Sequence, residues 1–277
     1  MDAEIGIFGG SGFYTFGPES GPARTITLDT PFGPPSAPVT ITEVGGRRVA
    51  FLPRHGNNHE FAPAAVPARA NLWAMRMLGV RQVIGPCAAG SLSPDLHPGD
   101  FLALDQLVDR TWGRPDTYYD AGDAHHVAFA DPYCAVLAAH AVAASERVGV
   151  RMHPSGTVVV IQGPRFSTRA ESRWYRQQGF DVINMTQYPE AYLARELGMH
   201  YTGIALVTDY DTGVEDVPGV EPVTQAEVFA SFDANIDRVR ALLTELVPAL
   251  PDEPDGCACA SAVGPLHAYD DHSLGTP

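Results

Sequence analysis

Two short segments near the N-terminus contain residue types that could hold an anion. Gly9-Gly10-Ser11-Gly12 directly follows an apolar run at residues 5–8, and Arg54-His55-Gly56 follows another at residues 49–52. Glycines let backbone N–H groups converge on an anion, and a serine adds a hydroxyl. A guanidinium can hold an oxyanion through two parallel hydrogen bonds. Both segments are therefore candidates for an anion site, although a glycine turn or a polar surface loop would use the same residues.

Two later segments offer groups suited to a flat organic ligand. Phe166 supplies an apolar face on which a planar ring can stack, while Ser167 or Thr168 could cap the helix expected next. Asp209 and Asp211 occupy alternate positions after a further apolar run, so at least one should face a ligand and could act as a general acid or base. Metal binding is an alternative use of this pair.

Other kinds of site fit the sequence less well. A dinucleotide fingerprint needs a glycine loop that opens a helix, but Phe13-Tyr14 follows the loop here. His55 and His59 are four residues apart on a loop with Gly56, which is a poor spacing for a metal site. The four cysteines, including a pair at Cys257-x-Cys259, give neither a disulfide framework nor a four-ligand zinc pattern. The sequence therefore predicts no metal site.

The composition restricts the partners of the chain. Its 18 basic and 33 acidic residues give a net charge of −15, which argues against binding to nucleic acid or an anionic membrane. No stretch approaches the roughly 20 apolar residues that cross a bilayer, and the N-terminus lacks the pattern of a signal peptide. We expect a cytoplasmic protein that binds small molecules in a local pocket.

Apolar runs alternate with helical periodicities, which predicts an α/β fold. A chain of 277 residues with 45% apolar content can bury one core, so we expect one domain over residues 1–250. The remaining residues, 251–277, should form a tail that is loosely ordered or contacts another subunit. Strands are expected at residues 5–8, 49–52, 81–86, 101–104, 157–161, 182–185 and 203–207, with hairpins or turns at 17–45. Helices are expected at residues 66–78, 133–148, 168–178, 189–197 and about 224–247, the last ending at Pro248.

Taken in order, the motifs resemble those of the trimeric methylthioadenosine and purine nucleoside phosphorylases. The resemblance implies a single α/β domain with a twisted mixed sheet flanked by helices, and a homotrimer with active sites near subunit boundaries. It also implies no cofactor and a role in purine and methionine salvage, with inorganic phosphate as co-substrate of a nucleoside. The matching segments are Gly-Gly-Ser-Gly-Phe at 9–13, Arg-His-Gly at 54–56, Arg-Ala-Asn-Leu-Trp-Ala at 69–74, Ala-Ala-Gly-Ser-Leu at 88–92, Gly-Pro-Arg-Phe-Ser-Thr-Arg-Ala-Glu at 163–171, Asn-Met-Thr at 184–186 and Thr-Asp-Tyr-Asp at 208–211.

The resemblance assigns residues to each part of the site. Asp209, typical of members that prefer adenine, would be the catalytic group, protonated because burial raises its pKa, and Glu190 would lie near the ribose. The phosphate site would contain Ser11, Arg54, His55, Cys87, Ala88 and Thr186. The purine and ribose would contact Ala89, Gly90, Phe166, Ser167, Met185, Asp209 and Asp211. The 5′ pocket would contain His59, Gln225 and Val228, with His126 from a neighbouring subunit.

The sequence departs from the family pattern at two positions and in its tail, which aligns with nothing and whose Cys257-x-Cys259 could be a strained disulfide, a casual metal binder or, as we expect, neither. Cys87 stands where many members have a phosphate-binding threonine, and Gln225 stands where adenine-type members have an aliphatic residue. The polar side chain leaves methylthioadenosine, adenosine and other 5′-modified adenosines open as substrates. A 6-oxopurine or broad-specificity purine nucleoside phosphorylase is the main alternative. A nucleosidase that uses water and a non-catalytic dinucleotide-binding module are further alternatives.

Overall fold

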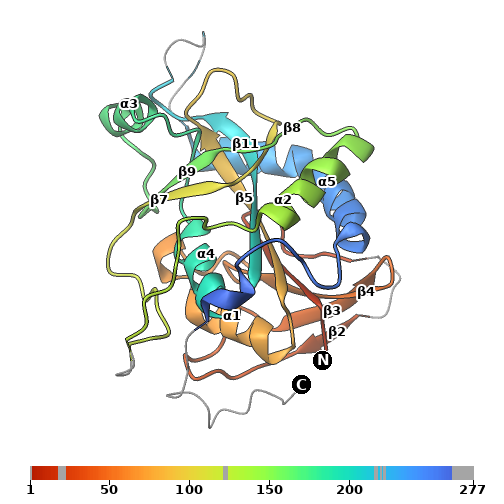
Figure 1. Ribbon diagram of the computed structural model, residues 1–277. Helices are drawn as coiled ribbons and strands as arrows, with labels where there is room; N and C mark the ends of the chain where they lie inside the picture. The colour runs from red at the N-terminus through yellow and green to blue at the C-terminus, as the bar shows by residue number, and fades with distance from the viewer. Residues whose placement is uncertain are drawn as a thin grey trace.

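A mixed β-sheet forms the centre of the protein (Figure 1). The computed structural model describes residues 2–17, 23–120, 124–214, 218, 220 and 223–263. Within these residues the main strand order is β2-β3-β4-β1-β5-β10-β9-β7, and β11 pairs with both β5 and β6. The strands are β1 (Ile5–Gly9), β2 (Arg24–Ile26), β3 (Val39–Val44), β4 (Arg47–Pro53), β5 (Gln82–Ser91), β6 (Phe101–Ala103), β7 (Gln106–Arg110), β8 (Met152–His153), β9 (Thr157–Ile161), β10 (Val182–Asn184) and β11 (His200–Tyr210).

Every strand expected from the sequence is present, because each is an apolar run that the sheet buries. β1 is buried at all its positions and lies parallel to both β4 and β5. In the region expected to contain hairpins, β2 pairs with β3, and β3 pairs in turn with β4, both antiparallel. No sequence signal predicts β7, whose residues are half-buried or exposed, or the two-residue β8. Edge strands of this kind lack the apolar run that marks a buried strand.

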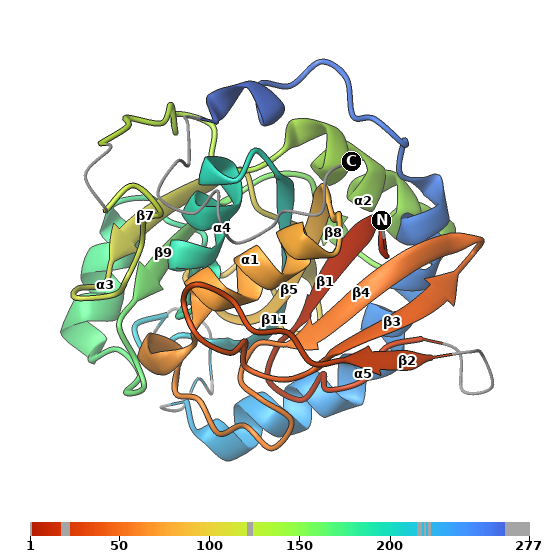
Figure 2. The same ribbon diagram turned by 90° about the horizontal axis from the view of Figure 1, so that it is seen from below.

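Helices cover both faces of the sheet (Figures 1 and 2). One core joins α1 (Ala68–Met77) and α4 (Gln187–Glu196) to the sheet through residues such as Trp73 and Leu193. The other joins α2 (Ala135–Arg147) and α5 (Gln225–Ala249) through residues such as Leu137, Phe232 and Leu246. The expected α/β sandwich of helices around a mixed sheet is therefore confirmed. The short helices η1 (Pro63–Ala65), α3 (Arg169–Gln177) and η2 (Ala260–Ala262) complete the described elements.

The helix boundaries follow from local capping. Thr168 caps α3 and Thr224 caps α5, each in a reciprocal capping box with a glutamate three residues later. The expected end of the last helix is slightly wrong, because α5 continues through Pro248 to Ala249. Proline in the last turn removes one backbone donor, which a helix end tolerates better than its interior does.

The segment after α5 lies against its own chain. Gln82 donates a 2.7 Å hydrogen bond from Nε2 to the carbonyl oxygen of Pro251, and Cys259 is 2% exposed. Over residues 251–263, this differs from the loosely ordered tail that the composition predicts. Residues 264–277 lie outside the described part.

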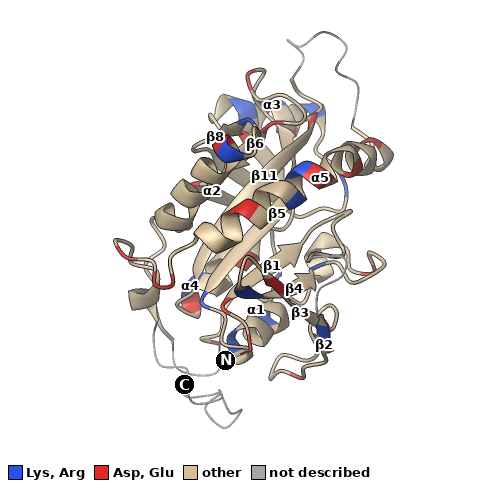
Figure 3. Ribbon diagram, turned by 90° about the vertical axis from the view of Figure 1, so that its right-hand side faces the viewer, with Lys and Arg blue, Asp and Glu red and all other residues tan. Residues whose placement is uncertain are grey.

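No helix in the described part of the chain is long and apolar enough to cross a membrane. On the side drawn in Figure 3, basic residues are spread over several elements and do not form one continuous stripe.

Candidate active site

One pocket is lined by almost all the residues that the sequence analysis assigns to the site. It is lined by segments that follow β1, β4, β9 and β10 and by the ends of β5 and β11, together with the first turns of α5. In open α/β sheets, ligands bind at such strand ends. The predicted residues that line the pocket are Ser11, Arg54, His55, His59, Cys87, Ala88, Ala89, Gly90, Phe166, Ser167, Met185, Thr186, Asp209, Asp211, Gln225 and Val228.

His126, unlike the residues just named, does not line the pocket of this chain. It is exposed, outside any helix or strand. Because the resemblance assigns it to the site of a neighbouring subunit, its role stays a prediction.

Several lining residues were missed by the sequence reasoning. Asn184 and Thr208 belong to recognised motifs, and Phe229 directly follows Val228 on α5, so adjacency was the available signal. Pro63 lies in the short helix η1, which carries no chemical motif, so the sequence contains no signal for it. Gly10 lies in the glycine segment predicted as an anion site, Pro164 lies in the matched motif at 163–171, and Ile161 and Ile183 lie in expected strands.

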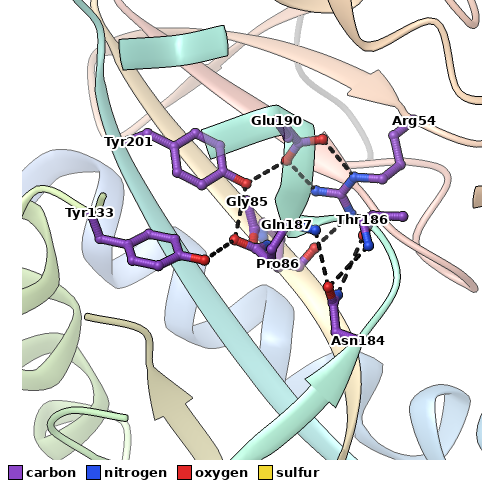
Figure 4. Close-up of polar contacts among 9 residues, drawn as sticks. All are labelled: Arg54, Gly85, Pro86, Tyr133, Asn184, Thr186, Gln187, Glu190 and Tyr201. Atoms are coloured by element: carbon purple, nitrogen blue, oxygen red, sulfur yellow. Dashed lines mark hydrogen bonds and ion pairs between the residues drawn. The ribbon is translucent and has the colours of Figure 1, made fainter. Parts of the chain in front are cut away.

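Arg54 is fixed in the pocket wall by a buried ion pair (Figure 4). Its Nε and Nη2 each donate a 2.9 Å hydrogen bond to Glu190, and its Nη1 donates a 2.8 Å bond to the carbonyl oxygen of Pro86. A guanidinium has five N–H groups, so one on Nη1 and one on Nη2 remain for an anion. Burial alone would lower the pKa of Arg54, but Glu190 raises it, and the net pKa lies above its ordinary value.

This pair corrects the expectation for Glu190. Its carboxylate does not line the pocket but is 2% exposed and binds Arg54 and the hydroxyl of Tyr201, which donates at 2.5 Å. Glu190 therefore positions Arg54 rather than contacting a ribose.

A network of buried polar side chains extends behind this pair (Figure 4). Tyr133 donates a 3.1 Å hydrogen bond to Oε1 of Gln187, whose Nε2 donates to the carbonyl oxygen of Gly85 at 3.1 Å. A Cβ atom at Gly85 would lie 2.0 Å from the Tyr201 hydroxyl, so only glycine fits there. Satisfied buried networks hold their members in one arrangement. The residues are far apart in sequence, so no local motif revealed them.

Asn184 orients the segment that carries Thr186. Its Oδ1 accepts 3.0 Å hydrogen bonds from the backbone N–H groups of Thr186 and Gln187. This arrangement satisfies two donors at the start of α4 and leaves the Thr186 side chain in the pocket wall.

The two histidines of the loop after β4 stack on each other. Their ring centroids are 4.6 Å apart, and His59 has a φ of 61°, an unusual conformation for a residue other than glycine. His55 Nδ1 is 2.8 Å from the carbonyl oxygen of Phe61, so we assign the ring proton to Nδ1. Burial lowers the pKa of His55 to about 4. The ring is therefore neutral at pH 7, with Nε2 as an acceptor.

The two carboxylates at the C-terminal end of β11 occupy different environments. Burial raises the pKa of Asp209 to about 6, and Thr208 donates a 2.7 Å hydrogen bond to its Oδ1. The register of β11 against β5 shifts between Val207 and Asp209, a bulge that turns the chain so that Thr208 and Asp209 both line the pocket. Asp211 accepts hydrogen bonds from the Ser167 hydroxyl at 2.9 and 2.7 Å. Asp209 is thus the better candidate for proton transfer.

Ser167 and Cys87 have roles that the sequence left open. Ser167 bonds to Asp211, and Thr168 is the residue that caps α3. Burial raises the pKa of the Cys87 thiol to about 12, so the side chain is a neutral, weak donor where a threonine hydroxyl was expected.

Comparisons with known proteins agree with this geometry. Residues 4–248 match the phosphorylase superfamily. The S-methyl-5′-thioadenosine phosphorylase of Mycolicibacterium smegmatis is 56% identical over 260 residues, which cover 94% of this chain and 96% of that protein. The purine nucleoside phosphorylase of Streptomyces coelicolor is 49% identical, with 95% of each chain covered.

The fold is also that of a solved relative. The structure of methylthioadenosine phosphorylase from Schistosoma mansoni in complex with adenine matches with a TM-score of 0.84 and 34% identity, covering 97% of this chain and 96% of that chain. Together with the pocket and the match over residues 4–248, these similarities establish that this chain belongs to the phosphorylase superfamily, in the family of S-methyl-5′-thioadenosine phosphorylases.

Proposed function

We propose that this protein catalyses the phosphorolysis of S-methyl-5′-thioadenosine, or a related 5′-modified adenosine, to adenine and 5-methylthioribose 1-phosphate. The observation that carries the proposal is that Asp209, with its raised pKa, lines the same pocket as Arg54 and His55. An acid for the leaving base and a site for an anionic nucleophile are the two groups that this reaction needs. The names of the relatives support the same activity.

The base leaves as an anion unless a proton or a donor offsets its charge. Asp209 can donate to N7 of the purine when it is protonated. Its pKa of about 6 reflects burial, and a purine placed against it would remove more water and raise the pKa further. Asp209 therefore acts as the group that stabilises the departing base.

Phosphate binds where Arg54, Ser11 and Thr186 meet. The two remaining N–H groups of Arg54 and the two hydroxyls donate to its oxygens. His55 accepts through Nε2, which selects a phosphate that still carries one proton. The bound phosphate oxygen attacks the anomeric carbon as its bond to the base breaks, which gives the sugar 1-phosphate. Positioning and electrostatics supply most of the rate enhancement.

The 5′ end of the pocket supports an apolar substituent. Val228 and Phe229 are half-buried residues of the first turns of α5, and Phe229 contacts His59 edge-on with ring centroids 5.4 Å apart. Gln225 is exposed at the start of the same helix. The apolar pair can contact a methylthio group while the Gln225 amide remains hydrated.

We further infer a homotrimer whose neighbouring subunit supplies His126, and an enzyme of cytoplasmic purine and methionine salvage. The exposure of His126 outside the pocket supports the trimer. Native mass spectrometry should give three chains per particle, and His126→Ala should raise the KM for the nucleoside without changing the oligomer. The active site uses phosphate as a substrate and no cofactor, so brief treatment with EDTA should leave kcat unchanged.

A base-release assay tests the proposed reaction. Methylthioadenosine, adenosine and inosine are each incubated with the enzyme, with and without phosphate. Adenine released from methylthioadenosine only when phosphate is present is the expected result. Release without phosphate would indicate a nucleosidase instead.

A broad-specificity purine nucleoside phosphorylase is the second candidate, favoured by the name of the Streptomyces relative. Efficient release of hypoxanthine from inosine would support it. In that outcome the reaction class stands, and Asp209 does not determine the choice of base.

A further inference from the structure

Three thiols and one imidazole converge on the side of the protein where the segment after α5 meets the body. Cys134, His200, Cys257 and Cys259 place one sulfur or ring nitrogen each within 4.8 Å of all the others. The first three positions come from different elements: Cys134 directly precedes α2, His200 begins β11, and Cys257 lies in the C-terminal segment. All of these cysteines are free thiols.

The spacing of these atoms fits a tetrahedral metal. Zinc binds cysteine sulfur at about 2.3 Å and histidine nitrogen at about 2.0–2.1 Å, so a tetrahedron has S–S edges of about 3.8 Å and S–N edges of about 3.5 Å. Cys134 Sγ is 3.8 Å from Cys257 Sγ and 3.6 Å from Nδ1 of His200, and Cys257 Sγ is 3.2 Å from the same nitrogen. A disulfide would need sulfurs about 2.05 Å apart.

Chance packing of cysteines explains this cluster poorly. Buried cysteines often behave as small apolar residues, which need no imidazole beside them. Here Cys257 is only half-buried, so a metal ion could reach the cluster from solvent. A sequence pattern could not have revealed the set, because Cys134 and Cys257 are 123 positions apart.

We propose that Cys134, His200, Cys257 and Cys259 form a structural zinc site that fastens the C-terminal segment to the body of the protein. Four protein ligands close the coordination shell, which is the arrangement of structural rather than catalytic zinc. The site is also remote from the chemistry, because the nine residue steps along β11 from His200 to Asp209 span about 30 Å. The thiols bind as thiolates and release their protons to solvent.

The zinc joins the start of α2, the start of β11 and the C-terminal segment. The C-terminal segment lies beside α4 (Figures 1 and 2), where Val263 covers Gly198. Cys134 and His200 already lie side by side, because the backbone N–H of Cys134 donates a 2.8 Å hydrogen bond to the carbonyl oxygen of Tyr201. Zinc attaches the C-terminal segment to this pair through Cys257 and Cys259. This inference does not depend on the proposed enzymatic function.

Metal analysis of the full chain tests the proposal. The protein is expressed in zinc-supplemented medium and purified without an affinity tag or chelator, and zinc and free thiols are counted. We expect about one zinc per chain in the wild type and almost none in the double variant Cys257→Ser/Cys259→Ser. The control Cys87→Ser should keep the wild-type zinc content, because Cys87 lies in the active-site pocket. Cobalt substitution should give the absorption of a tetrahedral cobalt thiolate in the wild type and in Cys87→Ser but not in the double variant.

Stability gives a second readout. Removing zinc should lower the melting temperature by roughly 5–10 °C and expose residues 251–263 to proteases, while the double variant should show both changes without chelator. The double variant alters only the C-terminal segment, so it should fold even if Cys134→Ser does not. A zinc-free wild type with four free thiols, a Cys257–Cys259 disulfide, or equal zinc in the double variant would each overturn the proposal.

Discussion

Arg114 donates a 2.9 Å hydrogen bond from Nη1 to the carbonyl oxygen of Met185. Its Nη2 donates another 2.9 Å bond to the carbonyl oxygen of Gln162. One buried guanidinium thus connects the segment that follows β9 to the segment that follows β10, and Met185 lies in the pocket wall. Burial lowers the pKa of Arg114 to about 10, so the side chain remains charged at neutral pH.

Replacing Arg114 should loosen this side of the pocket. We expect Arg114→Met to lower the free energy of unfolding by about 2–4 kcal/mol, because buried carbonyl groups lose their donors. The KM for the nucleoside should rise more than kcat falls, since the Met185 segment positions the substrate. Urea unfolding and steady-state kinetics measure the two effects.

Arg151→Gln is a suitable control for this experiment, because its side chain is 59% exposed. It should change stability by less than about 0.5 kcal/mol. An Arg114→Met enzyme with wild-type stability and KM would show that other contacts hold the two segments.

Breaking the Arg54–Glu190 pair should affect both folding and phosphate binding. In Glu190→Gln the buried guanidinium loses its countercharge, which costs about 3–5 kcal/mol of unfolding free energy. The KM for phosphate should rise as Arg54 moves, and the KM for the nucleoside should change less. Phosphate titrations at saturating nucleoside measure this difference.

The exposed Arg147–Glu245 pair provides the matched comparison. Glu245→Gln should cost less than about 1 kcal/mol, as expected of a surface ion pair, and should leave the KM for phosphate unchanged. If Glu190→Gln behaves in the same way, Arg54 does not need its partner.

The raised pKa of Asp209 predicts a pH profile. If the protonated carboxyl is the active form, kcat/KM should be constant well below pH 6 and should fall as the pH rises through about 6. Asp209→Asn should remove this limb, lower kcat, and shift preference from adenine toward hypoxanthine nucleosides. Phosphate titrates in both enzymes, so their difference isolates Asp209. Identical profiles would rule out Asp209 as the titrating group.

The same group should destabilise the folded protein above its pKa. Burial raises the Asp209 pKa from 3.8 to about 6, so the folded state binds the proton more tightly than the unfolded state does. The stability that this proton provides is complete below pH 3.8 and is lost as the pH rises through about 6. Asp209→Asn should therefore be more stable than the wild type at pH 8, by up to about 3 kcal/mol. Equal unfolding free energies at pH 8 would contradict this explanation.

The sequence could predict the parts of the fold and site that local signals encode. Buried runs marked strands such as β1 and β11, and residues at or just beyond the ends of strands, such as Asp209 and Arg54, marked the pocket. It could not predict the partner of Glu190, because that depends on which elements the tertiary fold brings together. The same is true of Arg114, whose acceptors are backbone carbonyls. Every residue type has a backbone carbonyl, so the sequence does not show which carbonyl groups accept a hydrogen bond.

Gln225 should set how well the enzyme accepts a methylthio group. Its side chain starts α5 beside Val228 and Phe229, so Gln225→Leu would extend an existing apolar wall. One additional apolar contact is worth roughly 1–3 kcal/mol in substrate discrimination, which corresponds to about 10–200-fold. We expect kcat/KM for methylthioadenosine relative to adenosine to rise toward the lower end of this range, because the position is exposed.

The matched variant Gln225→Glu should move the ratio in the opposite direction, since a carboxylate favours the 5′-hydroxyl over the thioether. Thr224 and Glu227 cap the helix in all three proteins, so α5 should begin at the same place in each. If the ratio is the same in the leucine, glutamate and wild-type enzymes, the 5′ substituent does not reach α5. Its recognition would then depend on His59 and on the neighbouring subunit.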